Sequence, residues 1–175
     1  MANIRTFGNK FRRKTYVLRL GAYALIRRSD GRIAIVQTPE GHFLVGGGVA
    51  GGESARTALR REAREECGCR LRVGPCVGVA DEFLFAKKER AYLQKRCTFF
   101  SAFITEQVVS SATEPDHLLK WVTPGDAIRD LFHESHRWAV RHAFMRRPNK
   151  THALEAGLHR RSIRASLGRR SDVSR

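Results

Sequence analysis

The sequence lacks any apolar run approaching the ~20 residues that a membrane-spanning helix needs. Its first fourteen residues also lack the apolar core of a secretory signal, because five of them are Lys or Arg. We therefore expect a cytoplasmic protein with no membrane partner. The four cysteines show no C-x-x-C pairing and no zinc-like spacing, so the sequence predicts reduced, mostly buried thiols.

Acidic residues are scarce, since 17 Asp and Glu stand against 33 Lys and Arg, for a formal net charge of +16. An excess of this size points to polyanionic partners such as RNA. Most of it lies at the two ends of the chain, because residues 1–14 contribute five positive charges and residues 146–175 contribute a net seven. The basic ends fit either a solvated, partly mobile tail or an electrostatic role toward polyanions, and both interpretations stay open.

Within this basic chain, three glutamates crowd into a single helical turn. Glu62, Glu65 and Glu66 have i, i+3 and i+4 spacing, which places them on one face of a helix. Like charges this close repel, and a divalent cation between them relieves the repulsion. Hard cations such as Mg²⁺ take carboxylate oxygens and commonly hold phosphate-bearing substrates. The alternative is a solvated helix laced with Arg–Glu ion pairs, but it does not account for the five glycines from Gly46 to Gly52.

The stretch around these glutamates resembles the Nudix box, G-x5-E-x7-R-E-U-x-E-E-x-G-U, in which U is aliphatic. All seven fixed identities are present, at Gly47, Glu53, Arg61, Glu62, Glu65, Glu66 and Gly68. The two aliphatic positions hold the smaller residues Ala63 and Cys69. A glycine loop that passes into a helix is also the context that such a motif requires.

The resemblance implies a Nudix-type α/β/α sandwich, an α/β fold with a mixed sheet and the box loop and helix at its edge. We expect this domain to span residues 15–147, between a basic N-terminal arm, residues 1–14, and a basic C-terminal tail, residues 148–175. The local patterns predict strands over 16–26, 33–37, 43–45, 97–104 and 118–122, and one long or two short strands over 71–85. They predict a two-residue turn at Asp30-Gly31 and a charged connection over 87–96. Helices are predicted from Ser54 to Gly68, from Thr123, and over 134–146.

The resemblance also implies hydrolysis of a nucleoside diphosphate linked to another moiety, by attack of water on phosphorus, with Mg²⁺ or Mn²⁺ as cofactor. The three clustered glutamates are the expected metal ligands, and the Gly46 carbonyl is a further candidate. Glu62 and Glu66 are the candidates for the base that deprotonates the attacking water. Arg61 is expected to hold Glu53 and the loop to the helix through a charge-assisted bridge.

Further site candidates lie outside the box. Family members often recruit an acid from a later loop, and Glu114 and Asp116 are the candidates here, with loop solubility as the alternative. His133 and His136 have i, i+3 spacing but no third ligand at a fitting distance along the chain. We therefore expect these two histidines to be surface residues and not a zinc site.

A strand aromatic and two cations are candidates for substrate contacts. Phe85 is a candidate to stack on a base, although core packing is the commoner role of such a residue. Lys95 and Arg96 are candidates to bind phosphate, with ordinary surface charge as the alternative.

The sequence leaves the substrate open. Phe85 stands where family members that act on ADP-ribose tend to have proline and those that act on dinucleoside polyphosphates tend to have tyrosine. A nucleoside triphosphate is the first expectation, and ADP-ribose or another nucleotide sugar is the second. Removal of pyrophosphate from an RNA 5′ end would give the basic termini a role. A non-catalytic nucleotide-binding or nucleic-acid-binding module on the same fold is disfavoured by the intact acids, and a homodimer remains compatible with the sequence.

Overall fold

The computed structural model describes residues 4–108, 113, 114 and 116–145, and the predicted tail, residues 148–175, lies outside them. The elements in chain order are β1 (Arg5–Gly8), β2 (Val17–Ile26), β3 (Ile33–Thr38), β4 (Gly41–Phe43), β5 (Gly46–Gly48), α1 (Ala55–Cys67), β6 (Cys69–Ala86), β7 (Ala91–Gln107), β8 (Leu118–Val122), α2 (Pro124–Asp130), α3 (Glu134–Val140) and a π-helical turn (Arg141–Met145). No helix in this described part of the chain is long and apolar enough to cross a membrane.

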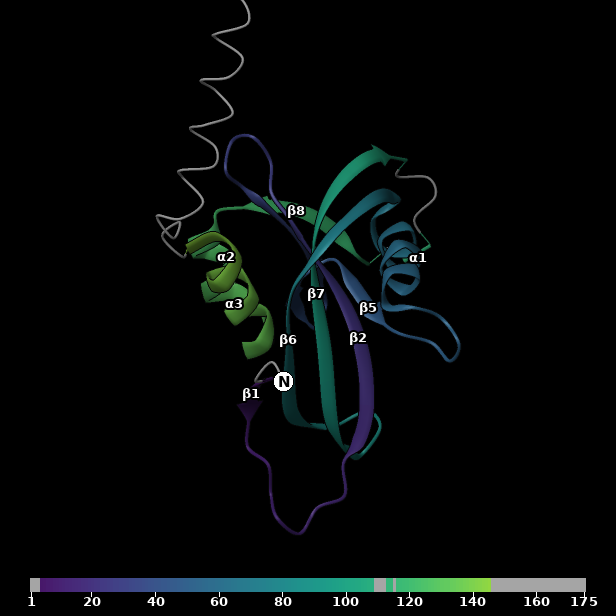
Figure 1. Cartoon of the computed structure of the whole chain (residues 1–175), viewed down its shortest axis with the longest axis vertical. Helices are drawn as coiled ribbons and strands as arrows, with labels where there is room; N and C mark the ends of the chain where they lie inside the picture. Colours follow the sequence, from purple (N-terminus) through teal and green to yellow (C-terminus); the bar gives the residue numbers. More distant parts are fainter. Residues whose placement is uncertain (1–3, 109–112, 115, 146–175) are drawn as a thin grey trace, which may run out of the picture. The chain divides into compact units, whose positions relative to one another are not determined.

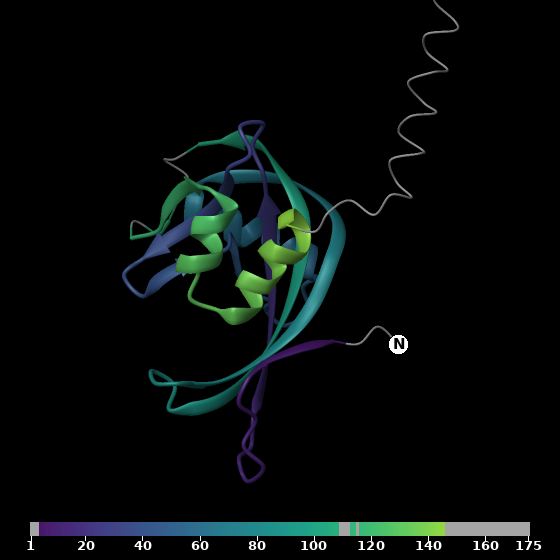
Figure 2. The same cartoon turned by 90° about the vertical axis from the view of Figure 1, so that its left-hand side faces the viewer.

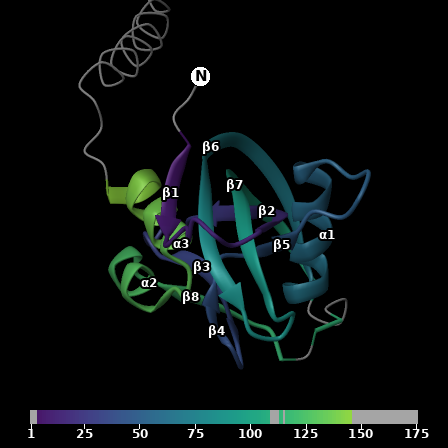
Figure 3. The same ribbon diagram turned by 90° about the horizontal axis from the view of Figure 1, so that it is seen from below.

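The strands form two sheets between helical layers. Five strands in the order β1-β6-β7-β2-β5 make a mixed sheet, in which β2 runs parallel to β7 while β6 runs antiparallel to it. Strands β4-β3-β8 make a smaller antiparallel sheet. Helix α1 lies on one side of the sheets (Figure 1), and α2 and α3 lie on the other side, which faces the viewer in Figure 2. Figure 3 shows the same layers from below. This arrangement of helices on both sides of the sheets confirms the predicted α/β/α sandwich with a mixed sheet.

Strands β2 and β3 belong to different sheets, although they follow each other in the chain. The predicted two-residue turn is wrong, because Gly31 N donates to Arg28 O at 3.0 Å and Arg28 N donates to Arg32 O at 2.8 Å, which closes a three-residue loop. Gly31 has φ 87°, as expected where a left-handed residue follows a type I turn. Beyond the loop an isolated bridge pairs Arg27 with Ile33, and β3 then diverges to pair with β4 and β8.

Strands β6 and β7 form one long hairpin, paired from Cys69 opposite Gln107 to Ala86 opposite Ala91. A single strand therefore covers residues 71–85. The charged connection predicted over 87–96 is wrong, because only residues 87–90 form the turn and β7 begins at Ala91. Lys95 and Arg96 are strand residues whose charged groups have partners within the fold, so their charge does not mark a solvated loop.

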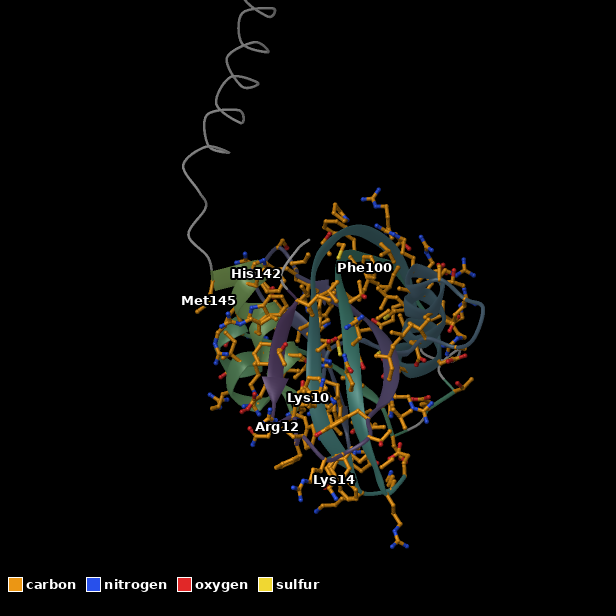
Figure 4. The ribbon with its side chains drawn as sticks, turned by 60° about the horizontal axis from the view of Figure 1, so that its bottom comes forward. Lys10, Arg12, Lys14, Phe100, His142 and Met145 are labelled. Atoms are coloured by element: carbon orange, nitrogen blue, oxygen red, sulfur yellow. The ribbon has the colours of Figure 1, made fainter. Side chains whose placement is uncertain are left out.

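The N-terminal segment, predicted as a basic arm, contributes β1, which pairs in parallel with β6 at the edge of the sheet. Gly8 has φ 72°, and a Cβ there would overlap the backbone oxygen of Phe83. In the loop that follows, the Lys10 ammonium lies 5.0 Å from the ring centroid of Phe83, and the Lys14 ammonium lies 5.2 Å from that of Tyr92. Lys10 and Lys14 are labelled in Figure 4. The basic loop therefore packs on the β6–β7 hairpin.

Two apolar clusters lie on opposite faces of the mixed sheet, and β2 contributes to both by alternation. Ala22 and Ala24 face α1, whereas Tyr23 and Leu25 face α2 and α3. The apolar face of α1 that packs on the sheet carries Ala58, Leu59, Ala63 and Cys67, which are all buried, and three of these side chains are small. The cysteines are free and three of the four are buried, which confirms their prediction.

Helix α3 corrects the prediction for two histidines. His133 and His136, expected on the surface, are 6% and 0% exposed. His133 is the N-cap residue of α3, and His136 lies within the helix, on the side that carries Ala139 and Val140 and packs against the sheet. His136 Nδ1 accepts a hydrogen bond from Leu44 N at 3.3 Å, so this imidazole satisfies a buried backbone amide in the core. The α-helix ends at Val140, before the predicted end at residue 146, and continues as the π-helical turn.

Candidate active site

The glycine loop before α1 brings the backbone against the helix. In β5, Gly46 and Gly47 pair with Tyr23 and Ala22 of β2. Gly46 has φ 126°, and a Cβ there would overlap the backbone oxygen of Ala22. A Cβ at Gly47 would lie 2.5 Å from the carboxylate carbon of Glu62. The missing side chains therefore allow the loop both to pair with β2 and to accept a glutamate from α1 at close range.

Helix α1 is capped at both ends by Ser54 and Gly68, the residues at which the sequence predicted that the helix starts and ends. Ser54 Oγ accepts a hydrogen bond from Thr57 N at 3.1 Å, which satisfies one of the free amides of the first turn. At the other end Gly68 has φ 63°, and its N–H bonds to the carbonyls of Ala63 and Arg64. The caps define where the helix starts and stops. Packing of α1 on the sheet places Glu62 against Gly47 and Glu66 against Gly46.

The three clustered glutamates differ in burial. Glu66 is 6% exposed, and its Oε2 accepts a hydrogen bond from Gly46 N at 2.9 Å. The side chain of Glu62 is 15% exposed and that of Glu65 is 37% exposed. The carboxylates therefore run from the margin of the sheet toward solvent, with Glu66 innermost.

Arg61 lies where the sequence predicted a bridge. Its Nη2 donates to Glu53 Oε1 at 2.8 Å and to the Gly48 carbonyl at 3.0 Å, which ties the loop to the helix. Its Nη1 donates to Glu62 Oε1 at 2.9 Å and to Glu65 Oε2 at 2.8 Å. Among the described residues Arg61 thus engages one oxygen of Glu62 and one of Glu65, which leaves the second oxygen of each for another ligand.

A further acid reaches the cluster from the segment before β8. The amides of Thr113 and Glu114 donate to the backbone carbonyl of Glu65 at 2.8 and 3.3 Å, which docks this segment on α1. His117 Nδ1 lies 2.6 Å from Glu114 Oε2 and 3.4 Å from Glu66 Oε1. Glu66, Glu114 and His117 each present one potential metal ligand atom within 4.8 Å of the others.

The structure separates the two late acids that the sequence proposed together. Glu114 lies beside Glu66, whereas Asp116 is exposed in a different depression, next to Pro39 and Leu118. The sequence interpretation missed His117. The i, i+3 spacing of Glu114 and His117 was the available signal, but its meaning depends on how the segment docks on α1.

The electrostatics of the cluster fit a bound cation. Burial raises the pKa of Glu66 to about 8; the Gly46 amide opposes this rise, and the charges of Glu62 and Glu114 add to it. Burial also raises the pKa of Glu62. Arg61 pairs with Glu62 and Glu65, whereas no Lys or Arg among the described residues forms an ion pair with the buried Glu66, and a divalent ion would supply positive charge there. Carboxylate oxygens are the ligands that Mg²⁺ and Mn²⁺ prefer, so the residues present fit either ion.

A cavity of about 840 Å³ lies against the glycine loop. Its wall is formed by Gly48 and Val49 of the loop, the first half of β2, the turn of the β6–β7 hairpin, Phe43, Phe132 and His133. Phe85, which is 48% exposed, and Lys95 line it, as their predicted substrate contacts require. Arg96 does not line the cavity, because adjacent strand residues point to opposite faces. Its guanidinium instead makes two hydrogen bonds of 2.8 Å to Asp81.

Comparisons with known proteins agree with this geometry. A family model described as the NUDIX domain matches residues 17–144. A search of curated proteins found no match. Among solved structures, a MutT NUDIX hydrolase from Burkholderia pseudomallei is 29% identical, with a TM-score of 0.51 over 73% of this chain and 98% of that one.

Two less similar structures share the fold. The dihydroneopterin triphosphate pyrophosphohydrolase of E. coli is 20% identical, with a TM-score of 0.58 over 72% of this chain and 94% of that one. An ADP-ribose pyrophosphatase from Streptococcus suis is 18% identical, with a TM-score of 0.51 over 75% and 94% of the two chains. Because the family model covers most of the sequence and the box has its loop-to-helix geometry, the chain belongs to the Nudix hydrolase family.

Proposed function

We propose that this Nudix hydrolase is a metal-dependent pyrophosphohydrolase that cleaves a nucleoside diphosphate linked to another moiety. The substrate is a nucleoside triphosphate or a nucleotide sugar such as ADP-ribose. The observation that carries the proposal is the convergence of Glu62, Glu65, Glu66 and Glu114 at the glycine loop, beside a cavity large enough for a nucleotide. The similar structures include a MutT NUDIX hydrolase and an ADP-ribose pyrophosphatase, whose names are in keeping with both substrate classes.

Each residue has a role in this proposal. The three box glutamates hold Mg²⁺ or Mn²⁺, and Glu114 and the Gly46 carbonyl are further candidate ligands. The ion supplies positive charge against the negative charge of the pyrophosphate. Arg61 positions Glu62 and ties Glu53 and the loop to the helix. Glu62 and Glu66 are the candidates for the proton acceptor, because burial raises the pKa of both toward the range in which a carboxylate acts as a base near neutrality.

A substrate screen with matched variants tests the proposal. Purified protein with Mg²⁺ is assayed against nucleoside triphosphates, ADP-ribose, dinucleoside polyphosphates and triphosphorylated RNA, and phosphate products are measured. Glu66→Gln should lower kcat by roughly 10²-fold to 10⁴-fold while circular dichroism stays unchanged. Glu106→Gln, which removes an exposed acid on β7, is the control and should retain activity. Nucleotide binding without turnover in the unmodified protein would instead identify a binding module.

A second candidate is pyrophosphate removal from an RNA 5′ end. The specific observation in its favour is the basic loop after β1, which packs on the hairpin that forms one wall of the cavity. Lys14 lies over Tyr92, and the Tyr92 ring lies 5.0 Å from that of Phe85, between centroids. The tip of the hairpin and this loop project at the same end of the described domain (Figures 1 and 2).

Salt dependence separates the two candidates. Replacement of Lys10 and Lys14 by methionine should weaken the binding of triphosphorylated RNA and reduce its salt slope by about two, and should leave the KM for free nucleoside triphosphates unchanged. Removal of residues 148–175 tests the predicted tail in the same assay. Equal RNA affinity and salt slope in all three proteins would rule out an electrostatic role of the basic ends.

A further inference from the structure

A buried carboxylate on β6 organises the start of α3. Glu82 is 8% exposed, and its Oε2 accepts hydrogen bonds from Ser135 Oγ at 2.5 Å and Ser135 N at 3.0 Å. Its Oε1 accepts from Glu134 N at 3.3 Å and lies 3.1 Å from His133 Nδ1. Burial raises the pKa of Glu82, but His133 and Ser135 outweigh burial and lower that pKa to about 2. Both oxygens of the ionised Glu82 carboxylate therefore bond to residues at the start of α3.

The contact with Glu82 determines what His133 offers on its other side. An ionised carboxylate only accepts hydrogen bonds, so Nδ1 of His133 carries a proton. Burial lowers the pKa of His133, and the nearby charge of Lys95 lowers it further against the opposing effect of Glu82. The ring is then neutral, and its Nε2, 2.8 Å from Lys95 Nζ, is an acceptor. Glu82 and His133 thus fix the position of the Lys95 ammonium group, which retains two further N–H donors.

The ammonium group lies in a cross-strand row on the wall of the cavity. Lys95 of β7 is directly opposite Glu82 of β6 on one side and Arg19 of β2 on the other. Both Lys95 and Arg19 line the cavity. Like charges on neighbouring strands repel, and Glu82 offsets only part of this repulsion because its oxygens bond to residues at the start of α3. An anion in the cavity relieves this repulsion.

The row is separate from the metal cluster. Along β2, Arg19 precedes Tyr23 by four residues, and Tyr23 pairs with Gly46, whose amide binds Glu66. At ~3.3 Å per strand residue, the row lies roughly 13 Å along the strand from the pairing position of Gly46, the residue that binds Glu66, although the loop comes closer at Gly48, which pairs with Gly21. An anhydride held by the box glutamates does not span this distance, whereas a whole nucleotide does.

We propose that Lys95 and Arg19, with Lys95 positioned by Glu82 and His133, form a second anion subsite that binds a phosphate group carried by the substrate away from the scissile anhydride. The guanidinium fork of Arg19 suits two phosphate oxygens, and Lys95 adds a fixed point charge. Among the described residues that line the cavity, cationic side chains outnumber acidic ones, four (Arg19, Lys87, Lys88, Lys95) to two (Glu40, Glu89), and Glu40 already pairs with Lys88. The inference names a substrate feature for the proposed hydrolase, but the subsite itself does not depend on turnover.

Binding without metal tests the subsite directly. Isothermal titration calorimetry in EDTA compares adenosine 3′,5′-bisphosphate with adenosine 5′-monophosphate. The bisphosphate should bind about tenfold or more tightly, and Lys95→Met should abolish this preference, because charge-assisted hydrogen bonds of this kind correspond to a factor of roughly ten or more. Lys120→Met, which removes an equal charge on β8 outside the cavity lining, is the control and should keep the preference. Equal affinity for the two ligands, or binding of neither, in the unmodified protein would overturn the proposal.

A double-mutant cycle tests the positioning role of His133. His133→Ala should lower the preference for the bisphosphate in the presence of Lys95 and have no further effect on it in the Lys95→Met background. A purely structural role of His133 would lower affinity in both backgrounds and so refute the positioning role. His133→Gln, which keeps an acceptor and a donor, should restore part of the preference and serves in place of the alanine variant if that variant fails to fold.

Steady-state kinetics identify the source of the phosphate. Adenosine 5′-triphosphate is compared with its 3′-phosphorylated form and with a 5′-triphosphorylated dinucleotide. A lower KM for both phosphate-bearing substrates assigns the subsite to any phosphate, and a lower KM for the dinucleotide alone assigns it to a phosphodiester. An unchanged KM for both contradicts the inference. Absence of all turnover, with the calorimetric preference intact, would refute the proposed hydrolysis and leave the subsite standing.

Discussion

Replacement of Glu66 by glutamine should stabilise the metal-free protein at the same time as it removes activity. Glu66 is 6% exposed, and burial and neighbouring acids raise its pKa from 4.5 to about 8. Linkage converts these two pKa values into a loss of about 3 kcal/mol of unfolding free energy at pH 7. Glutamine has the same shape, keeps an oxygen for the Gly46 amide and does not ionise, so it escapes this loss.

The sign of the pH dependence follows from the raised pKa. Below pH 4.5 the Glu66 carboxyl carries its proton in both the folded and the unfolded state, and the two proteins should be equally stable. As the pH rises from 4.5 toward 8, the unfolded chain releases the proton and the folded chain retains it, so the unmodified protein loses stability relative to Glu66→Gln. The difference should stay below about 1 kcal/mol at pH 5 and grow to about 3 kcal/mol at pH 7.

Urea unfolding in EDTA at pH 5 and pH 7 measures this difference. Glu106→Gln, which removes an exposed acid paired with Arg70, should show a change below about 1 kcal/mol at both values. Mg²⁺ at about 1,000 times its Kd should reverse the order, because a ligand at this excess adds about 4.1 kcal/mol to the protein that binds it, which exceeds the difference of about 3 kcal/mol. If Glu66→Gln is no more stable than the unmodified protein at pH 7 in EDTA, or if its gain does not depend on pH, the assignment of Glu66 as a desolvated acid is refuted.

Three further substitutions probe the loop and its bridge. Gly47→Ala places a methyl group 2.5 Å from the Glu62 carboxylate carbon, so it should lower kcat about tenfold or more with little change in melting temperature. An unchanged kcat would show that Glu62 does not need its present position. Gly46→Ala places a Cβ at a φ of 126° and against the backbone oxygen of Ala22, so it should lower the unfolding free energy by about 3 kcal/mol or more in urea titrations. A loss below about 1 kcal/mol would contradict the claim that this position requires glycine. Arg61→Lys cannot reach the loop and three acids together, so Mg²⁺-dependent activity should fall about 10-fold to 100-fold, and full activity would mean that the bridge is dispensable.

The parts of the site that could be predicted from the sequence depend on short-range geometry. Ser54 and Gly68 cap α1 through contacts within a few residues, and the spacing of the box acids is a property of any helix. The glycine loop could be predicted for a similar reason, since a run of glycines has few other uses immediately before a helix. These features hold whatever the remainder of the chain does.

The features that escaped prediction depend on partners distant in the sequence. Arg96 and Lys95 suggested a solvated connection, but Asp81 and His133, which lie 15 and 38 residues away, bind them within the fold. His133 was predicted to be a surface residue because the local sequence pattern does not show that the sheet packs against this part of the chain, where His133 is 6% exposed. His117 joins Glu66 only because its segment docks on α1. In each case the pairing of strands or the docking of a segment decided the environment of a polar side chain.

The anchoring of the segment before β8 has a consequence for mutagenesis of Glu65. That segment is attached to the main-chain carbonyl of Glu65, whereas the side chain of the same residue bonds to Arg61. The two attachments are chemically separable, because exchange of the side chain leaves the carbonyl in place. A substitution at this position therefore removes a carboxylate from the cluster without detaching the neighbouring acid, Glu114, and its kinetic effect reports on the Glu65 carboxylate and its bond to Arg61.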